Sequence, residues 1–209
     1  MGAEGSVWII GTTPESGGYG IYRWNASNWN KVPGGAVRIA VEPSGHAWIV
    51  NKENNIYRYT GSRFDQLPGS AMDIGVGADG SAWVIGTTPE SGGYGIYRWN
   101  GSYWDKVPGG ATRVAVDPVG DAWIVNTENN IYRYTGSRFE QLPGSAMDIG
   151  VGADGSVWVI GTTPESGGYG IYRWNSSDWD KVPGGAVGIS VDAFGDAWLV
   201  NEHNNIYAP

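Results

Sequence analysis

Residues 155–175 read Gly-Ser-Val-Trp-Val-Ile-Gly-Thr-Thr-Pro-Glu-Ser-Gly-Gly-Tyr-Gly-Ile-Tyr-Arg-Trp-Asn, and this stretch decides the fold. It occurs almost unchanged at 80–100 and with slightly more variation at 5–25. The copies place Trp8, Trp83 and Trp158 at intervals of 75 residues. Self-similarity of this length at a fixed period is the signature of a repeat architecture. We therefore interpret the chain as a tandem array.

Each 75-residue unit is itself double. Weaker relatives of the tryptophan stretch occur at 47–51, 122–126 and 197–201, so the six tryptophans are separated by 40 and 35 residues in turn. The extra length lies in one place, where the long modules carry Gly-Thr-Thr-Pro-Glu-Ser-Gly-Gly-Tyr-Gly and the short modules carry only a few residues around an Asn-Asn pair. One loop is therefore expected to be longer in every second module.

Each module predicts four short strands. In the second module they fall at 37–41, 47–51, 56–59 and 63–67, and Pro68-Gly69 is expected to end the last one. Runs of four to six β-branched and aromatic residues between Gly, Pro, Asn and Ser are typical of strands joined by tight turns. No helical periodicity of apolar residues occurs. The sequence therefore predicts an all-β protein.

The four strands differ in character. The first is rich in Gly, Ala and Val, which suits an innermost strand near a crowded axis, whereas the polar, proline-containing fourth strand suits a free outer edge. Four-stranded antiparallel sheets arranged radially form a β-propeller. We predict a six-bladed propeller occupying residues 1–209 as a single domain, with the repeated tryptophans packed between neighbouring sheets.

The ends of the chain complicate this count. Three complete units need 225 residues, and only five innermost strands are visible, at 36–41, 71–77, 111–116, 146–152 and 186–191. Residues 1–5 match only the end of a first strand, and the last strand visible is a third one at 205–207. We expect a shortened inner strand in the first blade and no outer strand in the last. A five-bladed body, or one closed by segments shared between chains, is the alternative.

Composition excludes several classes of function. The net charge of −8 disfavours nucleic acid and anionic membrane surfaces as partners. The absence of cysteine excludes disulfides and thiolate metal sites, and no stretch approaches the roughly 20 apolar residues that span a bilayer. We expect no membrane insertion and a protein that is cytoplasmic or released without a signal peptide.

The module pattern resembles the tectonin repeat. This pattern is Pro-Gly-x-Ala-x-x-Ile-x-Val-x-x-x-Gly-x-x-Trp-x-Val-Asn followed by Ile-Tyr-Arg-Tyr, and it occurs from Pro33 to Tyr59 and again, in close form, from Pro108 to Tyr134. The resemblance implies a six-bladed propeller lectin that binds carbohydrate, including methylated sugars and bacterial surface glycans, often in innate defence. It makes glycans the expected partner and agglutination the expected activity, and a homo-oligomer is compatible with it.

Signatures of an enzyme are absent from the sequence. The two histidines, His46 and His203, occupy unrelated module positions, and no catalytic or metal-binding spacing of residues occurs. The Gly-rich loop lacks the Lys-Ser/Thr that completes a phosphate-binding loop. We therefore expect no catalytic residues, no metal and no cofactor.

Carbohydrate-binding sites typically use an aromatic ring face to contact the C–H surface of a sugar and planar amide or guanidinium groups to bind its hydroxyls. The loops between second and third strands carry one set of candidates, which are Tyr19, Tyr94 and Tyr169 together with Asn54, Asn55, Asn129 and Asn130. The alternative is that the Asn pairs only form turns with positive φ and that the tyrosines cover the rim.

A second set of candidates is an arginine that recurs between two aromatic residues of the third strand. Its members are Arg23, Arg58, Arg98, Arg133 and Arg173. These side chains either bind sugar hydroxyls in the cleft between blades or stack on aromatic rings and pair with acids of the structure.

Our main hypothesis is a multivalent lectin with several similar glycan sites around one ring. Two alternatives stay open. One is a non-enzymatic scaffold whose loops bind a peptide, and the other is an amplified or engineered propeller without a ligand, which the near identity of the units would also explain.

Overall fold

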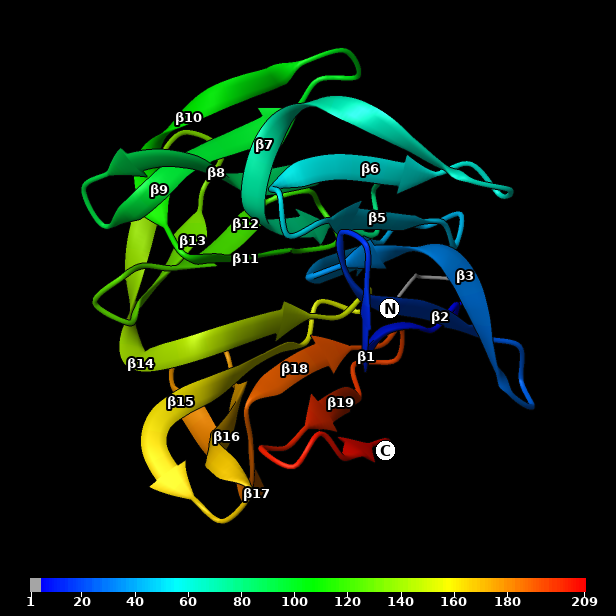
Figure 1. Ribbon diagram of the computed structural model, residues 1–209. Coiled ribbons are helices and arrows are strands. Elements are labelled where there is room, and N and C mark those ends of the chain that lie inside the picture. Colours follow the sequence, from blue (N-terminus) through cyan, green and yellow to red (C-terminus); the bar gives the residue numbers. More distant parts are fainter. Residues whose placement is uncertain (1–4) are drawn as a thin grey trace.

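The computed structural model describes residues 5–209, and within them the secondary structure consists of strands only. None of the described residues belongs to a helix long and apolar enough to cross a membrane. The strand pairs form six antiparallel sheets, which we call blades 1 to 6. They follow one another once around a central axis, from the blue first blade to the red sixth one (Figure 1). This radial arrangement is a β-propeller.

The odd blades are the long modules and the even blades the short ones. Blade 1 contains β1 (Trp8–Glu15), β2 (Gly18–Trp24) and β3 (Trp29–Ala36). Blade 2 contains β4 (Arg38–Val41), β5 (Ala47–Val50), β6 (Asn55–Tyr59) and the first part of β7 (Phe64–Val76). Blade 3 contains the rest of β7 with β8 (Ala82–Glu90), β9 (Gly93–Trp99) and β10 (Trp104–Ala111). Blade 4 contains β11 (Arg113–Val116), β12 (Ala122–Val125), β13 (Asn130–Tyr134) and the first part of β14 (Phe139–Val151). Blade 5 contains the rest of β14 with β15 (Val157–Glu165), β16 (Gly168–Trp174) and β17 (Trp179–Ala186). Blade 6 contains β18 (Gly188–Val191), β19 (Ala197–Val200) and β20 (Ile206–Tyr207).

Two strands are longer than the sequence indicated. The prediction that a strand at 63–67 ends at Pro68-Gly69 is wrong, because β7 continues to Val76 and serves both blade 2 and blade 3, as β14 serves blades 4 and 5. Gly69 absorbs the bend with a φ of +88°, a conformation that costs glycine little. The prediction of a shortened inner strand in blade 1 concerns residues that are mostly outside the described part of the chain.

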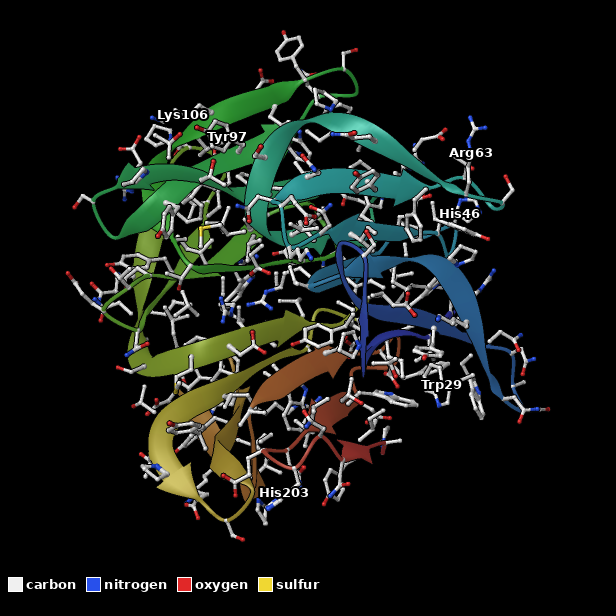
Figure 2. All side chains as sticks on the ribbon, viewed as in Figure 1. Trp29, His46, Arg63, Tyr97, Lys106 and His203 are labelled. Carbon is white, nitrogen blue, oxygen red and sulfur yellow. The ribbon has the colours of Figure 1, made fainter. Side chains whose placement is uncertain are left out.

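The lengthened segment of the long modules is a hairpin rather than a loop. Strands β8 and β9 stay paired up to Glu90 and Gly93, so Tyr94 lies in the ladder opposite Pro89. Tyr97 of β9 and Lys106 of β10 lie together on the outer part of this blade (Figure 2). A Cβ added at Gly86 would meet the Tyr97 ring at 2.7 Å, so glycine makes room for this ring.

The hydrophobic core lies between blades. One cluster joins Trp83 and Ile85 of blade 3 to Val114 and Ile124 of blade 4, and similar clusters join blade 1 to 2, blade 2 to 3, blade 4 to 5 and blade 5 to 6. Trp8, Trp48, Trp83 and Trp123 are buried. The prediction that the second-strand tryptophans pack between sheets is confirmed for these four.

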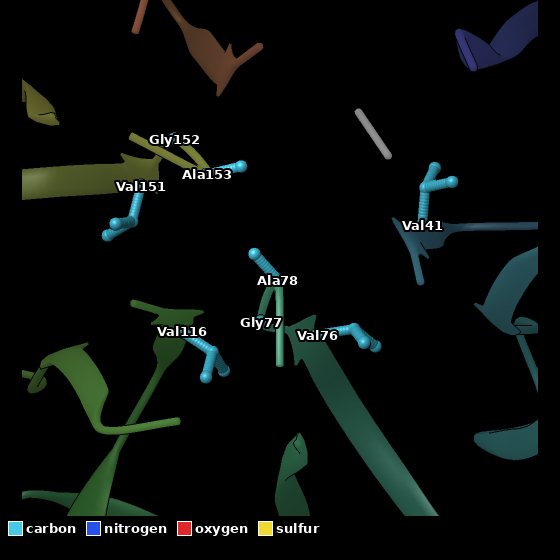
Figure 3. Close-up of a pocket in the computed structure, with 8 residues that line it drawn as sticks. All are labelled: Val41, Val76, Gly77, Ala78, Val116, Val151, Gly152 and Ala153. Carbon is cyan, nitrogen blue, oxygen red and sulfur yellow. The ribbon is translucent and has the colours of Figure 1, made fainter. Parts of the chain in front are cut away.

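The axis is surrounded by small side chains, as expected for innermost strands. Val41, Val76, Val116 and Val151 surround the space shown in Figure 3, together with the Gly-Ala pairs at 77–78 and 152–153. This space measures about 20 Å³, which is enough for about one water molecule. It therefore offers no room for a sugar.

Buried carboxylates tie successive blades together. Asp73 of β7 forms an ion pair with Arg38 of blade 2 (3.2 Å, Nε to Oδ1) and accepts a hydrogen bond from the backbone N–H of Val114 of blade 4 (2.9 Å). Asp148 repeats this arrangement with Arg113 and the N–H of Ile189. Burial raises the pKa of Asp73 to about 6, although Arg38 and Arg113 oppose the rise; Asp148 adds to it.

Replacing Asp73 by Asn removes this titration. The difference in unfolding free energy between the parent and this variant should therefore depend on pH. Because the pKa of Asp73 is higher in the folded protein than in the unfolded chain, the carboxyl group favours folding at low pH and loses this contribution as pH rises through about 6. Relative to D73N, the parent protein should lose about 2 kcal/mol of unfolding free energy between pH 4 and pH 7. Urea denaturation of both proteins at the two pH values measures this; a difference that is independent of pH would contradict it.

Candidate functional site

The structure separates the predicted site residues into two groups. The tyrosines and the Asn pairs lie at the hairpins between second and third strands, such as β5–β6 and β8–β9. Each arginine instead lies opposite the tryptophan of the second strand, as Arg58 does opposite Trp48, toward the other end of the blade. The two predicted sets therefore do not form one site.

The geometry of the Asn pairs matches the turn alternative. Asn54 and Asn129 both have a φ of +65°, which Asn tolerates better than most residues. The carbonyl oxygen of Asn54 accepts a hydrogen bond from Ala71 N–H at 2.9 Å. The turn is organised by the buried Asn51, whose Oδ1 accepts the backbone N–H groups of Glu53 and Asn55. Asn51 was missed as a structural residue, although a recurring Asn that ends each Trp-x-Val-Asn run was a visible signal.

Asn55 and Asn130 follow these turn residues at the start of a strand. Asn55 pairs with Ser70 of β7, and Asn130 donates a side-chain hydrogen bond to Glu128 at 3.2 Å. Their side chains are only partly exposed.

The three tyrosines are not equally available. Tyr19 is 45% exposed, whereas Tyr94 and Tyr169 are partly buried and pack against the clusters of their blades. The tyrosines and Asn residues stay predictions as ligand contacts.

All five arginines stack on tryptophan. Each guanidinium carbon lies 5.3–5.5 Å from the centre of an indole ring; the pairs are Arg23–Trp8, Arg58–Trp48, Arg98–Trp83, Arg133–Trp123 and Arg173–Trp158. Such cation–π contacts contribute about 0.5–2 kcal/mol each. The stacking fixes the plane of the guanidinium, so its N–H donors point in a defined direction.

A cleft opens where a short blade meets the following long blade. Between blades 2 and 3 it has a volume of about 310 Å³, at the lower end of the range typical of small-ligand pockets. Its walls are the indoles of Trp48 and Trp99, the guanidinium of Arg58 and the turn of blade 2; the lining residues are Glu42, Pro43, Ser44, Trp48, Arg58, Gly80 and Trp99.

Glu42 organises the polar wall of this cleft. Arg58 donates through Nε to Oε2 (2.9 Å) and through Nη2 to Oε1 (3.1 Å), and Trp48 Nε1 donates to Oε2 at 2.8 Å. Ser44 donates its hydroxyl to Oε1. Burial alone would raise the pKa of Glu42, but the hydrogen bonds from Arg58, Ser44 and Trp48 together hold it below its usual value. Glu42 is therefore ionised at neutral pH.

The interface between a long blade and the following short blade is packed tightly instead. Between blades 3 and 4, a Cβ added at Gly120 would lie 2.3 Å from Asp79 Oδ2 and 2.6 Å from Ser81 Oγ. The Gly120 carbonyl also accepts a hydrogen bond from Trp83 Nε1 at 3.1 Å, and Arg98 donates to Ser81. The corresponding Gly45 and Gly195 meet Ser6 and Asp154 in the same way.

The space available for an added Cβ at these glycines thus distinguishes the two kinds of interface. A Cβ added at Gly80, beside the open cleft, would meet no atom within 4 Å. The sequence treats the five arginines alike, but the structure places Arg58 in the lining of a cleft, and the repeat places Arg133 in the equivalent position. Arg23, Arg98 and Arg173 lie at packed interfaces.

The groups that line this cleft recur between blades 4 and 5. Arg133 donates to Asp117 Oδ2 at 3.0 Å, and the Trp123 and Trp174 rings lie 6.3 Å apart, compared with 6.2 Å for Trp48 and Trp99. A Cβ added at Gly155 would meet only Pro118, at 3.9 Å. Blades 4 and 5 therefore repeat the side-chain arrangement of the cleft between blades 2 and 3, at positions related by the 75-residue repeat.

The chemistry of these clefts is that of a binding site. Two indoles, a guanidinium with free N–H donors and an ionised carboxylate lie together, and His46 and His203 lie far apart (Figure 2). Among residues 5–209, no group of three or more His, Asp or Glu side chains is arranged to hold a metal ion.

Comparison with known proteins supports the repeat and the fold. A family model described as the tectonin domain matches residues 35–121 and 110–209. No curated protein sequence matches the chain significantly. A solved structure described as "YCF48 bound to D1 peptide", a β-propeller, is similar with a TM-score of 0.58 and 17% identity, over 92% of this chain and 71% of the other. A likeness at this identity shows the fold alone.

The difference between open and packed interfaces predicts different costs for one substitution. Gly80→Ala and Gly120→Ala carry the same backbone strain, because the φ angles are +86° and +88°. Only Gly120→Ala displaces Asp79 and Ser81, so it should lower the unfolding free energy by about 1–3 kcal/mol more than Gly80→Ala does. Thermal or urea denaturation of the two variants measures this, and equal costs would show that the interfaces do not differ.

Proposed function

The chain belongs to the tectonin family, and from this premise we propose that it is a multivalent lectin whose open interblade clefts bind surface glycans. The family and the propeller fold support a lectin-like or protein-interaction protein. The observation that carries the finer proposal is the cleft of about 310 Å³ in which Arg58 lies on Trp48 and faces the space beside Trp99.

Each wall of the cleft suits one part of a sugar. The partly exposed indole of Trp99 offers an apolar surface for the C–H groups of a pyranose ring, whereas the buried Trp48 supports Arg58 from below. The Arg58 side chain is 48% exposed, so its remaining N–H groups are available to hydroxyl oxygens. Because Glu42 holds this guanidinium in place, little conformational freedom is lost when a ligand binds, which favours affinity.

Several similar binding sites on one rigid propeller can bind the same surface at once, so each site can be weak. Two clefts on one propeller would bind a dense glycan surface with an avidity about 10²–10⁴ times the affinity of one site, and would cross-link particles. Such cross-linking supports agglutination, and the family resemblance makes bacterial or O-methylated glycans the proposed ligands and defence the proposed role.

Replacing arginine by lysine in the two kinds of interface tests the site. Lysine keeps the charge but loses the planar fork and the stacking on tryptophan. Arg58→Lys with Arg133→Lys should weaken binding to a glycan array at least tenfold, because two oriented donors per cleft are lost. The matched control, Arg98→Lys with Arg173→Lys, should bind as the parent does.

As a control for folding, both double variants should have the same circular dichroism spectrum as the parent. Equal weakening in the two would remove the open clefts from the binding site, and a blank array for the parent with a protein ligand recovered instead would favour the interaction-scaffold alternative.

A further inference from the structure

We propose that the junction between blade 6 and blade 1, which we call the seam, binds an extended segment of another polypeptide as an added strand. The two blades, red and blue, are neighbours in the ring (Figure 1). The seam is bordered by Ile206 and Tyr207 of β20 on one side and by Trp24 and Trp29 of blade 1 on the other. It is separate from the cleft at Arg58, so this inference does not depend on the lectin function.

The other two junctions that lead from a short blade to a long blade are complete. Each is spanned by one continuous strand, β7 between blades 2 and 3 and β14 between blades 4 and 5, which is the outer strand of one blade and the inner strand of the next. Among residues 5–209, no strand pairs with the outer edge of β20 or with the inner edge of β1. One strand of the same kind would therefore complete both blades at once.

The outer edge of blade 6 exposes an apolar side chain that the complete blades bury. Ile206 is 43% exposed. Ile56 and Ile131 occupy its position in blades 2 and 4, where they are fully buried and pair with Leu67 and Leu142 of the fourth strand. An unpaired strand edge with exposed apolar side chains is a template for another strand, and the addition of a peptide strand to such an edge is a common mode of recognition.

The aromatic residues on the blade 1 side are also left uncovered. In blade 3, Trp99 is partly buried, and Trp104 donates to the carbonyl oxygen of Pro68 in β7 at 2.8 Å. The corresponding Trp24 of blade 1 is 38% exposed, and for Trp29 no residue in the range 5–209 occupies the place of Pro68. The seam therefore continues the established interblade interface, without the strand that covers it elsewhere.

The strands β7 and β14 show which sequence fits the seam. Both read Phe-Asp/Glu-Gln-Leu-Pro-Gly-Ser-Ala-Met-Asp-Ile-Gly-Val. In the register of the complete blades, the Leu lies opposite Ile206, the Gln opposite Tyr207 and the last Gly opposite Trp8. A Cβ added at the corresponding Gly75 would lie 3.0 Å from the carbonyl oxygen of Val114 in the next blade, so this position favours glycine.

The seam differs from the complete junctions in one charge. Asp73 and Asp148 pair with Arg38 and Arg113 of the preceding blade, but blade 6 has Gly188 at the position of these arginines. An acid buried at this point of a bound segment would lack its guanidinium partner, which is costly. The segment that fits best therefore carries an uncharged residue there, such as asparagine.

A fluorescently labelled peptide tests the seam. It copies residues 138–152 with Asp148→Asn and reads Arg-Phe-Glu-Gln-Leu-Pro-Gly-Ser-Ala-Met-Asn-Ile-Gly-Val-Gly. Titration with the protein should raise its fluorescence anisotropy to saturation at one peptide per chain. Two control peptides carry Leu142→Asp, which disturbs pairing with blade 6, or Gly150→Val, which disturbs pairing with blade 1. Each should bind about tenfold more weakly or less.

A matched pair of protein variants places the peptide on β20. Ile206→Lys puts a charge at the edge that the added strand would bury, so it should weaken binding about tenfold. Val119→Lys changes an exposed apolar residue of blade 4 and should leave binding unchanged. Hydrogen exchange of the backbone amides of β20 and β1 should slow when the peptide is bound.

The peptide controls keep the test independent of how the protein variants fold. Absence of saturable binding, equal binding of the control peptides, or unchanged binding by Ile206→Lys would overturn the proposal. A protein that sediments as a dimer without peptide, with the amides of β20 and β1 already protected, would assign the seam to a second copy of this chain and would overturn it as well.

Discussion

The packing of a tryptophan from one blade against the next blade is the interaction on which the rest of the structure depends. A three- or four-stranded sheet of this size cannot bury both of its faces alone, so each blade is stabilised by its neighbours. Trp83 illustrates this, because its ring lies in a cluster with residues of blade 4 while its Nε1 donates to Gly120. The arginine that stacks on each of these rings is first of all part of this packing.

The packing between blades is not the same at every interface. In a short blade the tryptophan Nε1 donates to an acid of its own turn, as Trp48 does to Glu42, and not to the neighbouring blade. In a long blade it donates to the next turn, which closes the interface. The alternation of module lengths is therefore accompanied by an alternation in the interfaces. The Arg–Trp pair belongs to the packing in both, and between blades 2 and 3 the Arg58 guanidinium also lines a cleft.

The sequence was sufficient to predict the propeller fold and the order of the strands within a module, because the repeat period and the turn residues can be read from it directly. It failed at β7, where Pro68-Gly69 indicated an end and the chain continues through a bend. The sequence also could not show which of the five arginines lies beside a cleft. Whether a cleft exists beside Arg98 depends on Asp79 meeting Gly120, two residues 41 positions apart in different blades, and no periodicity reports the space between them.

The number of sugar molecules bound per chain tests the central claim most directly. Isothermal titration of the parent protein to saturation, with a monosaccharide selected on the array, should give two sites per chain, one for Arg58 and one for Arg133. A stoichiometry of five, one for each Arg–Trp pair, would contradict the distinction between open and packed interfaces on which the account depends.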